Sequence, residues 1–311
     1  MPNLHDYFSI TVSSKDKKCF IYDPDNTAAF FIYSPEPNDI FITKRLEISL
    51  FYRPSFDNTP WNSIIQPEQN IPLLKSNLQK AIRRKQTDIA IATFIVLLKL
   101  SPIDVLRRLP VIFIEDVCLM TSFPIVVWLM MCDNEYTIKK VDVFILVNII
   151  KSLCETDEVF MDNKEIKEYN GGHKELFKIC DDSSKDAILA LYYRSKYGGL
   201  KGDMEMLRRA INYYLECGNI VETKWNHTIS FSHKVTIIPE SIDFHPYPNL
   251  LWDINRITRI HKDIIKKSIW NAESCINVRK PETQLCSDNE KKLPIWKIIK
   301  VVLDDWRSKN I

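Results

Sequence analysis

Glycine is rare in this chain of 311 residues, and its scarcity excludes one large class of binding site. The sequence holds only six glycines, all of them between Gly171 and Gly218. No Gly-x-x-x-x-Gly-Lys-Ser/Thr segment is present, so the chain lacks the phosphate-binding loop of Walker-type nucleotide sites. Few glycines combined with long apolar runs favour helices that are joined by short connections.

Sequence patterns for metal binding and disulfides are missing as well. None of the eight cysteines stands in a Cys-x-x-Cys spacing. Cys118, Cys132 and Cys154 fall inside apolar runs, where a thiol acts as a small hydrophobe. No secretory signal follows Met1. We therefore expect a reduced, intracellular protein of the cytoplasm or nucleus, or of a virus factory, that holds no metal and needs no cofactor.

The chain also has no large excess of one charge and no long hydrophobic run. Its net charge is only +2, so binding of a polyanion would depend on a local basic patch. The longest apolar runs, residues 123–132 and 141–150, are shorter than the roughly 20 residues that a membrane-spanning helix requires. We expect no contact with a membrane. Hydrophobic residues make up 45% of the chain, which is enough for a substantial core.

The residues that are present divide the chain into a β-rich start and a long helical part. Residues 1–53 alternate short β-branched and aromatic runs with turn residues, which predicts a small β-meander. Residues 54–72 are punctuated by prolines and form the expected connector. Residues 73–311 are expected to be a helical domain with a short β-hairpin near residues 225–238. The predicted fold class is mainly α (α+β), a helical bundle with a small N-terminal meander.

The helical prediction is strongest between Lys75 and Met131. Residues 88–99 are apolar nearly all round, which is typical of a buried helix. Ser101 and Pro102 then mark a new helix, with Ser101 as its N-cap, and Pro110 is expected to interrupt or kink it.

Beyond this segment, the patterns predict a further series of helices and one loop. The segments are a helix over residues 136–155, an exposed loop over 156–182, helices over 186–196 and 204–216, an amphipathic helix or helical pair over 250–271 and a final helix over 296–306.

A family resemblance appears in the same central stretch. Its motifs are Lys80-Ala81-Ile82-Arg83, Asp88 with Ala90, Arg107-Arg108-Leu109 and Ile114-Glu115-Asp116-Val117. Together they resemble the helical C-terminal collar of RarA/MgsA-type clamp-loader-like AAA+ ATPases, over residues 75–131 only and without the ATPase module. The resemblance implies an oligomerising region in which Arg83, Arg107, Arg108, Glu115 and Asp116 take part in helix packing. The many Lys, Ile and Asn residues also resemble those of proteins from large DNA viruses.

Two groups of basic residues are candidates for binding the backbone of DNA or a protein partner. The first group consists of Lys80, Arg83, Arg84, Lys85, Arg107 and Arg108. The second group lies near Trp270 and consists of Arg256, Arg259, Lys266 and Lys267. Cations interleaved with aromatic residues suit phosphates and stacked bases. A solvated helix face has the same pattern and is the more frequent case.

A glycine turn before Lys201 is a further candidate site. A lysine at the start of a helix can bind a phosphate group there. The alternative is a plain glycine turn followed by the helix over residues 204–216, with Asp203 as its cap. We favour the alternative, because the carboxylate at the cap would repel an anion.

Asp243 and His245 form the last candidate site. They are two residues apart, so in an extended segment both side chains face the same side. Such a pair suits half of a metal site or the acid–base pair of a metal-dependent hydrolase. The alternative is a hydrogen bond that fixes His245 within a proline-rich turn. We favour the alternative, because no second cluster of ligands has a matching spacing.

These observations favour a non-catalytic helical scaffold or oligomerisation factor associated with DNA replication or repair. It would bind the nucleic-acid backbone, a protein partner or further copies of itself through its basic helix faces. Two alternatives stay open: a metal-dependent hydrolase with a dispersed site around Asp243 and His245, and a structural component of a viral assembly. The scaffold is preferred because the sequence contains no complete catalytic constellation.

Overall fold

The computed structural model describes the helical part of the chain with several gaps, together with short strands near its start. The described residues are 4–6, 8–9, 21–22, 29–32, 43–46, 48–50, 70–132, 138, 140–179, 185–216, 218–224, 235–243, 248–273, 278–279 and 293–310. Helices account for most of them, which confirms the mainly α fold class.

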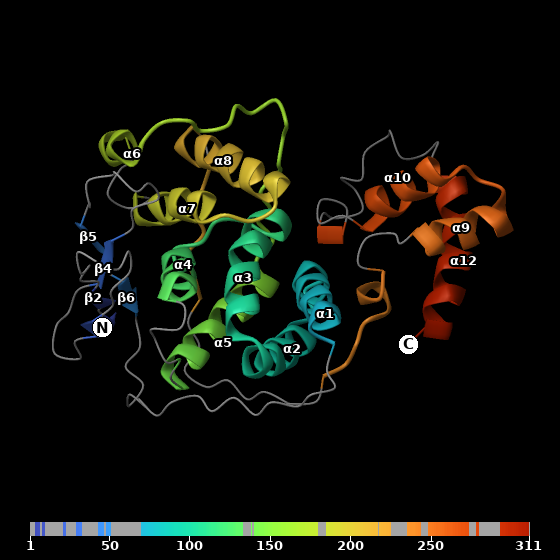
Figure 1. The fold of residues 1–311 in the computed structure, drawn as a ribbon, viewed down its shortest axis with the longest axis horizontal. Helices are drawn as coiled ribbons and strands as arrows, with labels where there is room; N and C mark the ends of the chain where they lie inside the picture. The colour runs from blue at the N-terminus through green and yellow to red at the C-terminus, as the bar shows by residue number, and fades with distance from the viewer. Residues whose placement is uncertain are drawn as a thin grey trace.

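After residue 70 the described chain runs from helix to helix (Figure 1). The helices are α1 (Ile71–Arg83), α2 (Thr87–Leu100), α3 (Pro102–Asp116), α4 (Phe123–Cys132), α5 (Lys140–Glu155), α6 (His173–Ile179), α7 (Lys185–Tyr197), α8 (Lys201–Glu216), the short 3₁₀ helix η2 (Pro239–Ser241), α9 (Pro248–Thr258), α10 (Lys262–Glu273) and α12 (Leu293–Asn310).

Short strands are described near the start of the chain. They are β1 (Leu4–Asp6), β2 (Phe8–Ser9), β3 (Ile21–Tyr22), β4 (Ala29–Ile32), β5 (Thr43–Leu46) and β6 (Ile48–Leu50). They pair antiparallel, β1 with β6, β2 with β3 and β4 with β5. Most of residues 1–53, and the connector up to residue 69, lie outside the described residues, so the predicted β-meander stays a prediction.

The first two helices follow directly from their sequences. α1 begins after Asn70, whose Oδ1 accepts a hydrogen bond from the amide of Leu73 at 3.1 Å. Its apolar residues recur at helical spacing, and Leu78 and Ile82 among them are fully buried. The predicted buried helix is α2, which is apolar nearly all round and packs against α1, α3 and α5.

α3 differs from its prediction at its cap, and it decides between the two effects predicted for Pro110. Ser101 occupies the N-cap position, but its hydroxyl donates to the carboxylate of Asp104 at 2.6 Å and makes no cap to a backbone amide. The helix continues through Pro110 to Asp116, so the proline does not interrupt it. Pro110 is buried, and the packing of α3 against α1, α2, α4 and α8 outweighs the one helical hydrogen bond that a proline removes.

The segment predicted as an exposed loop, residues 156–182, is partly anchored. It contains α6 and two buried aromatic residues, Phe160 and Tyr169. The ring of Phe160 packs edge-on against Tyr213 of α8, and that of Tyr169 against Tyr192 of α7. These contacts attach the segment to the surface of two helices.

Only part of the predicted β-hairpin belongs to the described residues. Residues 235–238 are described and form no strand, whereas residues 225–234 lie outside the described residues. The amphipathic stretch 250–271, predicted as one helix or a helical pair, is the pair α9 and α10. The final helix α12 is longer than predicted at both ends.

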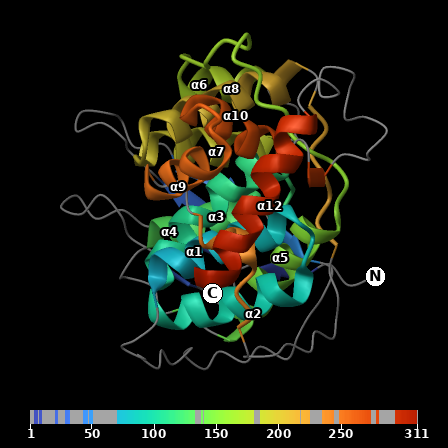
Figure 2. The ribbon, with the colours of Figure 1, turned by 90° about the vertical axis from the view of Figure 1, so that its right-hand side faces the viewer.

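Apolar side chains are buried in two separate clusters. The larger one is shared by α1 to α8 and contains Phe94, Phe113 and Trp128. The smaller one joins α9, α10 and α12 and consists of Leu250, Ile254, Ile265, Ile269, Ile299 and Leu303. Figure 1 shows these three helices as a group beside α1, and Figure 2 views the molecule from their side. We call α1–α8 the bundle and α9, α10 and α12 the C-terminal unit.

Candidate functional site

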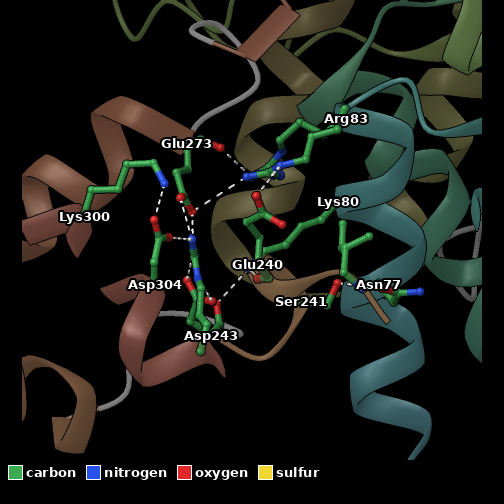
Figure 3. Close-up of polar contacts among 12 residues, drawn as sticks. Asn77, Lys80, Arg83, Glu240, Ser241, Asp243, Glu273, Lys300 and Asp304 are labelled. Carbon is green, nitrogen blue, oxygen red and sulfur yellow. Dashed lines mark hydrogen bonds and ion pairs between the residues drawn. The ribbon is translucent and has the colours of Figure 1, made fainter. Parts of the chain in front are cut away.

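Several predicted basic residues lie where the bundle meets the C-terminal unit. The end of α1 faces η2 and the ends of α10 and α12, and the contacts between them are charged (Figure 3). We call this region the charged seam; it consists of Lys80, Arg84, Glu240, Asp243, Glu273 and Arg307. Its geometry decides which cations of α1 are available to a partner.

Lys80 is bound by the backbone of the segment around η2. Its Nζ donates hydrogen bonds to the carbonyl oxygen of Glu240 and, at 2.8 Å, to that of Asp243. Burial lowers the pKa of Lys80 to about 8, and the carboxylate of Asp243 partly opposes that shift. The ammonium group therefore joins α1 to this segment and is turned away from solvent.

The arginines of the charged seam are surrounded by carboxylates from different elements. Arg84 approaches Glu240 at 3.3 Å and Glu273 at 3.7 Å. Arg307 of α12 is 2% exposed and donates to both oxygens of Asp243, at 3.1 and 2.8 Å. It also donates to both oxygens of Glu273, at 3.0 and 2.6 Å. Glu273 thus links α1, α10 and α12 through its two arginine partners.

A second charged network lies inside the bundle, between α1 and α3. Arg83 Nε donates to Asp116 at 2.5 Å, and Gln79 donates to the other oxygen of Asp116 at 2.6 Å. Arg108 donates to Gln79 at 3.1 Å and approaches Glu115 at 3.4 Å. These contacts join α1 to α3 through Arg83, Arg108, Glu115 and Asp116, whereas Arg107 is exposed and takes no part in them.

Glu115 is the member of this bundle network whose pKa is shifted toward neutrality. Burial raises the pKa of its carboxyl group to about 7, and repulsion from Asp116 adds to the shift. The guanidinium groups of Arg108 and Arg83 oppose it. The charge of the network therefore changes near neutral pH.

The remaining cations of the first group have different surroundings. Lys85 follows α1 with a φ of 58° and pairs with the exposed Asp157. Arg107 is exposed on α3, with its guanidinium 5.7 Å from the ring centroid of Tyr197. Arg107 is thus available on the surface, whereas the neighbouring Arg108 is bound inside the bundle network.

Lys201 is the first residue of α8 and extends into solvent. Its side chain is 91% exposed and approaches Glu205 at 3.8 Å. The preceding Gly198 has a φ of 102°, as the predicted glycine turn requires. The helix begins earlier than predicted, so Asp203 lies in its first turn, where it pairs with Arg108 at 3.7 Å. An anion at this helix start would still meet the carboxylate of Asp203.

The predicted pair of Asp243 and His245 is only half described. Asp243 is 4% exposed, and Arg307 binds both of its carboxylate oxygens. His245 belongs to residues 244–247, which lie outside the described residues. In the part of the chain that the structure describes, no three His, Cys, Asp or Glu side chains converge as metal ligands. The partner of Asp243 is thus a distant arginine that the local pattern does not suggest.

The second group of predicted basic residues lies on the surface of the C-terminal unit. α9 and α10 pack against each other and are joined by a tight turn in which Arg259 has a φ of 61°; we call the pair the α9–α10 hairpin. Arg256, Arg259, Lys266 and Lys267 are all exposed. Arg256 pairs with Asp253 at 3.5 Å, whereas the other three have no carboxylate partner among the described residues.

Two tryptophans lie beside these cations. Trp252 and Trp270 are each 60% exposed. Trp252 precedes Arg256 by four residues, and Trp270 follows Lys266 by four. Because residues four apart lie on the same side of a helix, each helix of the α9–α10 hairpin presents an indole next to a cation.

Sequence reasoning missed Glu240, Glu273 and Arg307, which determine the orientation of the cations on α1. One local signal was present for Arg307. It continues the apolar stripe of α12 four residues after Leu303, on the face that packs against α9 and α10. A charged residue on a buried stripe indicates an internal partner, because an unpaired buried charge is strongly destabilising.

Comparison with known proteins finds no family model, no curated protein and no solved structure that matches this chain. The resemblance of residues 75–131 to the clamp-loader collar therefore stays a prediction. Across the described residues, no helix has both the length and the apolar character needed to cross a bilayer.

Proposed function

We propose that this protein is a non-catalytic helical scaffold that binds the phosphate backbone of nucleic acid, DNA in particular, through the α9–α10 hairpin. One observation carries the proposal. Arg259, Lys266 and Lys267 are exposed and have no carboxylate partner among the described residues. By contrast, Lys80, Arg83, Arg84 and Arg108 are bound within the chain.

The charge balance of the hairpin supports a polyanionic partner. Residues 248–273 contain five Lys or Arg residues and three Asp or Glu residues. One of those carboxylates, Glu273, is bound in the charged seam. Unpaired surface cations attract a phosphate backbone, and the counterions released on binding make the affinity depend on salt.

In this proposal the bundle is the scaffold. Its cations form ion pairs between helices, and these pairs fix the positions of α1, α3 and the C-terminal unit relative to one another. An association with DNA replication or repair, and the assembly of several copies or of a protein partner, extend the proposal; they are supported by the resemblance of residues 75–131 alone.

The test is a titration of the full chain with a labelled DNA duplex over a series of salt concentrations. We expect the affinity to fall steeply with salt. The double variant Lys266→Gln/Lys267→Gln should lower the affinity and reduce the slope of log K against log salt by about 2, because two phosphate contacts are lost.

A matched control removes two lysines whose charges are already paired. Lys300 and Lys309 of α12 each pair with an aspartate four residues away along the helix. Lys300→Gln/Lys309→Gln changes the net charge by the same amount and should leave the salt slope nearly unchanged. A salt-independent affinity, or equal effects of the two double variants, would overturn the proposal.

A further inference from the structure

The two tryptophans of the α9–α10 hairpin are equally exposed but differ in what covers their rings. The ammonium group of Lys262 lies over the ring of Trp252 and occupies one of its faces. Among the described residues, neither another ring nor a cation packs on Trp270. Trp270 is thus an indole with its ring available, and Lys266 lies one helical turn away.

From this difference we infer that the α9–α10 hairpin binds single-stranded nucleic acid, with a base stacked on Trp270 and the adjoining phosphates on Lys266 and Lys267. The inference rests on the proposed function and adds two things to it: the strand type and the residue that recognises the bases.

An open indole favours a single strand because a duplex keeps the faces of its bases stacked on one another. An unpaired base can turn one face onto an aromatic side chain, and such stacking contributes about tenfold or more to affinity per base. Every base has such a face, so this contact selects for strand type and tolerates any sequence.

The charges around Trp270 agree with this geometry. Lys266 and Lys267 are exposed on the same helix. Asp263, the other exposed charged residue of α10, lies about two helical turns before Trp270 and approaches His261 at 3.5 Å. Glu273, three residues after Trp270, is bound to Arg307 and Arg84, so the exposed charges of α10 nearest the indole are the two lysines.

An anionic lipid surface is the main competing partner for exposed tryptophans and lysines. A helix that lies on a membrane needs a broad apolar face free to enter the lipid. In α9 and α10 that stripe is used inside the molecule, since Leu250, Ile254, Ile265 and Ile269 form the core of the C-terminal unit. The large apolar side chains that stay exposed on the hairpin are Trp252, Ile257, Ile264 and Trp270. On each helix the two lie about a third of a turn apart around the axis, so they do not line one broad apolar face.

The experiment compares three labelled probes with the full chain at one salt concentration: a short oligothymidylate, an abasic strand of the same length and a duplex of the same length. The abasic strand keeps the phosphates and lacks the bases. We expect the wild type to bind the oligothymidylate about tenfold more tightly than the abasic strand. Trp270→Ala should abolish this difference while the abasic and duplex affinities stay the same, and Trp270→Phe should keep most of it.

The matched control is Trp252→Ala, which removes an indole of equal exposure from the neighbouring helix and should keep the preference. Equal binding of the oligothymidylate and the abasic strand by the wild type would overturn the inference and leave the proposed backbone binding intact. Equal losses in the two alanine variants would also overturn it. Absence of binding to every probe would reject both proposals, and binding of phosphatidylserine vesicles in place of the probes would reassign the surface to a membrane.

Discussion

Burial of Glu115, with repulsion from Asp116, makes the stability of the protein depend on pH. Its pKa of about 7 in the folded protein is above its ordinary value of 4.5. Between these two values the folded protein holds a proton on Glu115 that the unfolded chain releases. The stabilisation is thus present at low pH and is lost as the pH rises through about 7.

Replacement of Glu115 by glutamine should remove this dependence, because the amide is neutral at both ends of the range. Relative to the wild type, Glu115→Gln should gain on the order of 1 kcal/mol in free energy of unfolding between about pH 5 and about pH 8. Urea unfolding of both proteins at the two pH values measures the difference.

A suitable control is Glu205→Gln, which removes a carboxylate from the surface pair with Lys201 on α8. If that variant shows the same pH-dependent gain, or if Glu115→Gln shows none, then burial of Glu115 beside Asp116 is not the cause.

At the scale of elements, a single amide side chain attaches the segment around η2 to the bundle. Asn77 of α1 is fully buried. Its Oδ1 accepts hydrogen bonds from the amide of Ile238 at 2.9 Å and from the hydroxyl of Ser241 at 2.7 Å. Its Nδ2 donates to the hydroxyl of Thr93 at 2.8 Å and to the carbonyl oxygen of Thr236 at 3.0 Å. All the hydrogen-bonding capacity of this amide is used.

Asn77→Ala should therefore leave several buried polar groups without partners. We expect a loss of about 2 to 3 kcal/mol in the free energy of unfolding, measured by urea denaturation. The amide of Ile238 should also exchange its hydrogen faster, because that amide donates to the deleted side chain.

Asn212→Ala is the comparison for this variant. Asn212 also lies on a helix, but it makes one exposed hydrogen bond, to the carbonyl oxygen of Lys167. Its loss should change the stability by less than about 0.5 kcal/mol. Equal destabilisation by the two variants would show that the buried hydrogen bonds of Asn77 contribute little.

For the whole molecule, the charged seam holds together two units of very different size. The bundle contains a large apolar cluster, whereas the C-terminal unit has six fully or nearly buried apolar residues. The small unit therefore depends on polar contacts with the bundle to keep its place. Arg307 is central to these contacts, because it binds Asp243 and Glu273 together.

Arg307→Met should destabilise the protein by about 3 to 5 kcal/mol, because two partly or fully buried carboxylates lose their shared partner. Hydrogen exchange should show which helices lose stability. Amides of α9, α10 and α12 should exchange faster, whereas those of α2 and α5 should exchange as in the wild type.

Arg209→Met provides the matched change inside the bundle, since Arg209 also binds an aspartate with two parallel bonds, to Asp162 at 2.7 Å each. It should leave exchange in the C-terminal unit unchanged. Faster exchange spread evenly over the whole chain in Arg307→Met would mean that the two units unfold as one.

Several elements were predictable because their signals are local. The buried character of α2 follows from its apolar periodicity, and the turn before α8 from its glycines. The amphipathic stripe over residues 250–271 predicted helix there and left open whether one helix or two would form. Helix ends were predicted less well. α8 begins two residues before the predicted cap. α3 continues through Pro110, where packing against neighbouring helices outweighs the hydrogen bond that the proline removes.

What the amino-acid sequence determined by itself was the helical architecture and the two places where cations gather. Only the tertiary structure decided which of those cations are exposed and which are paired inside the chain. Arg83 pairs with Asp116, which is 33 residues away along the chain, and Arg307 pairs with Asp243, which is 64 residues away. Lys266 and Lys267 have no such acid among the described residues. Periodicity reports which face of a helix is polar, but the orientation of a charge depends on carboxylates that folding brings close from distant parts of the chain.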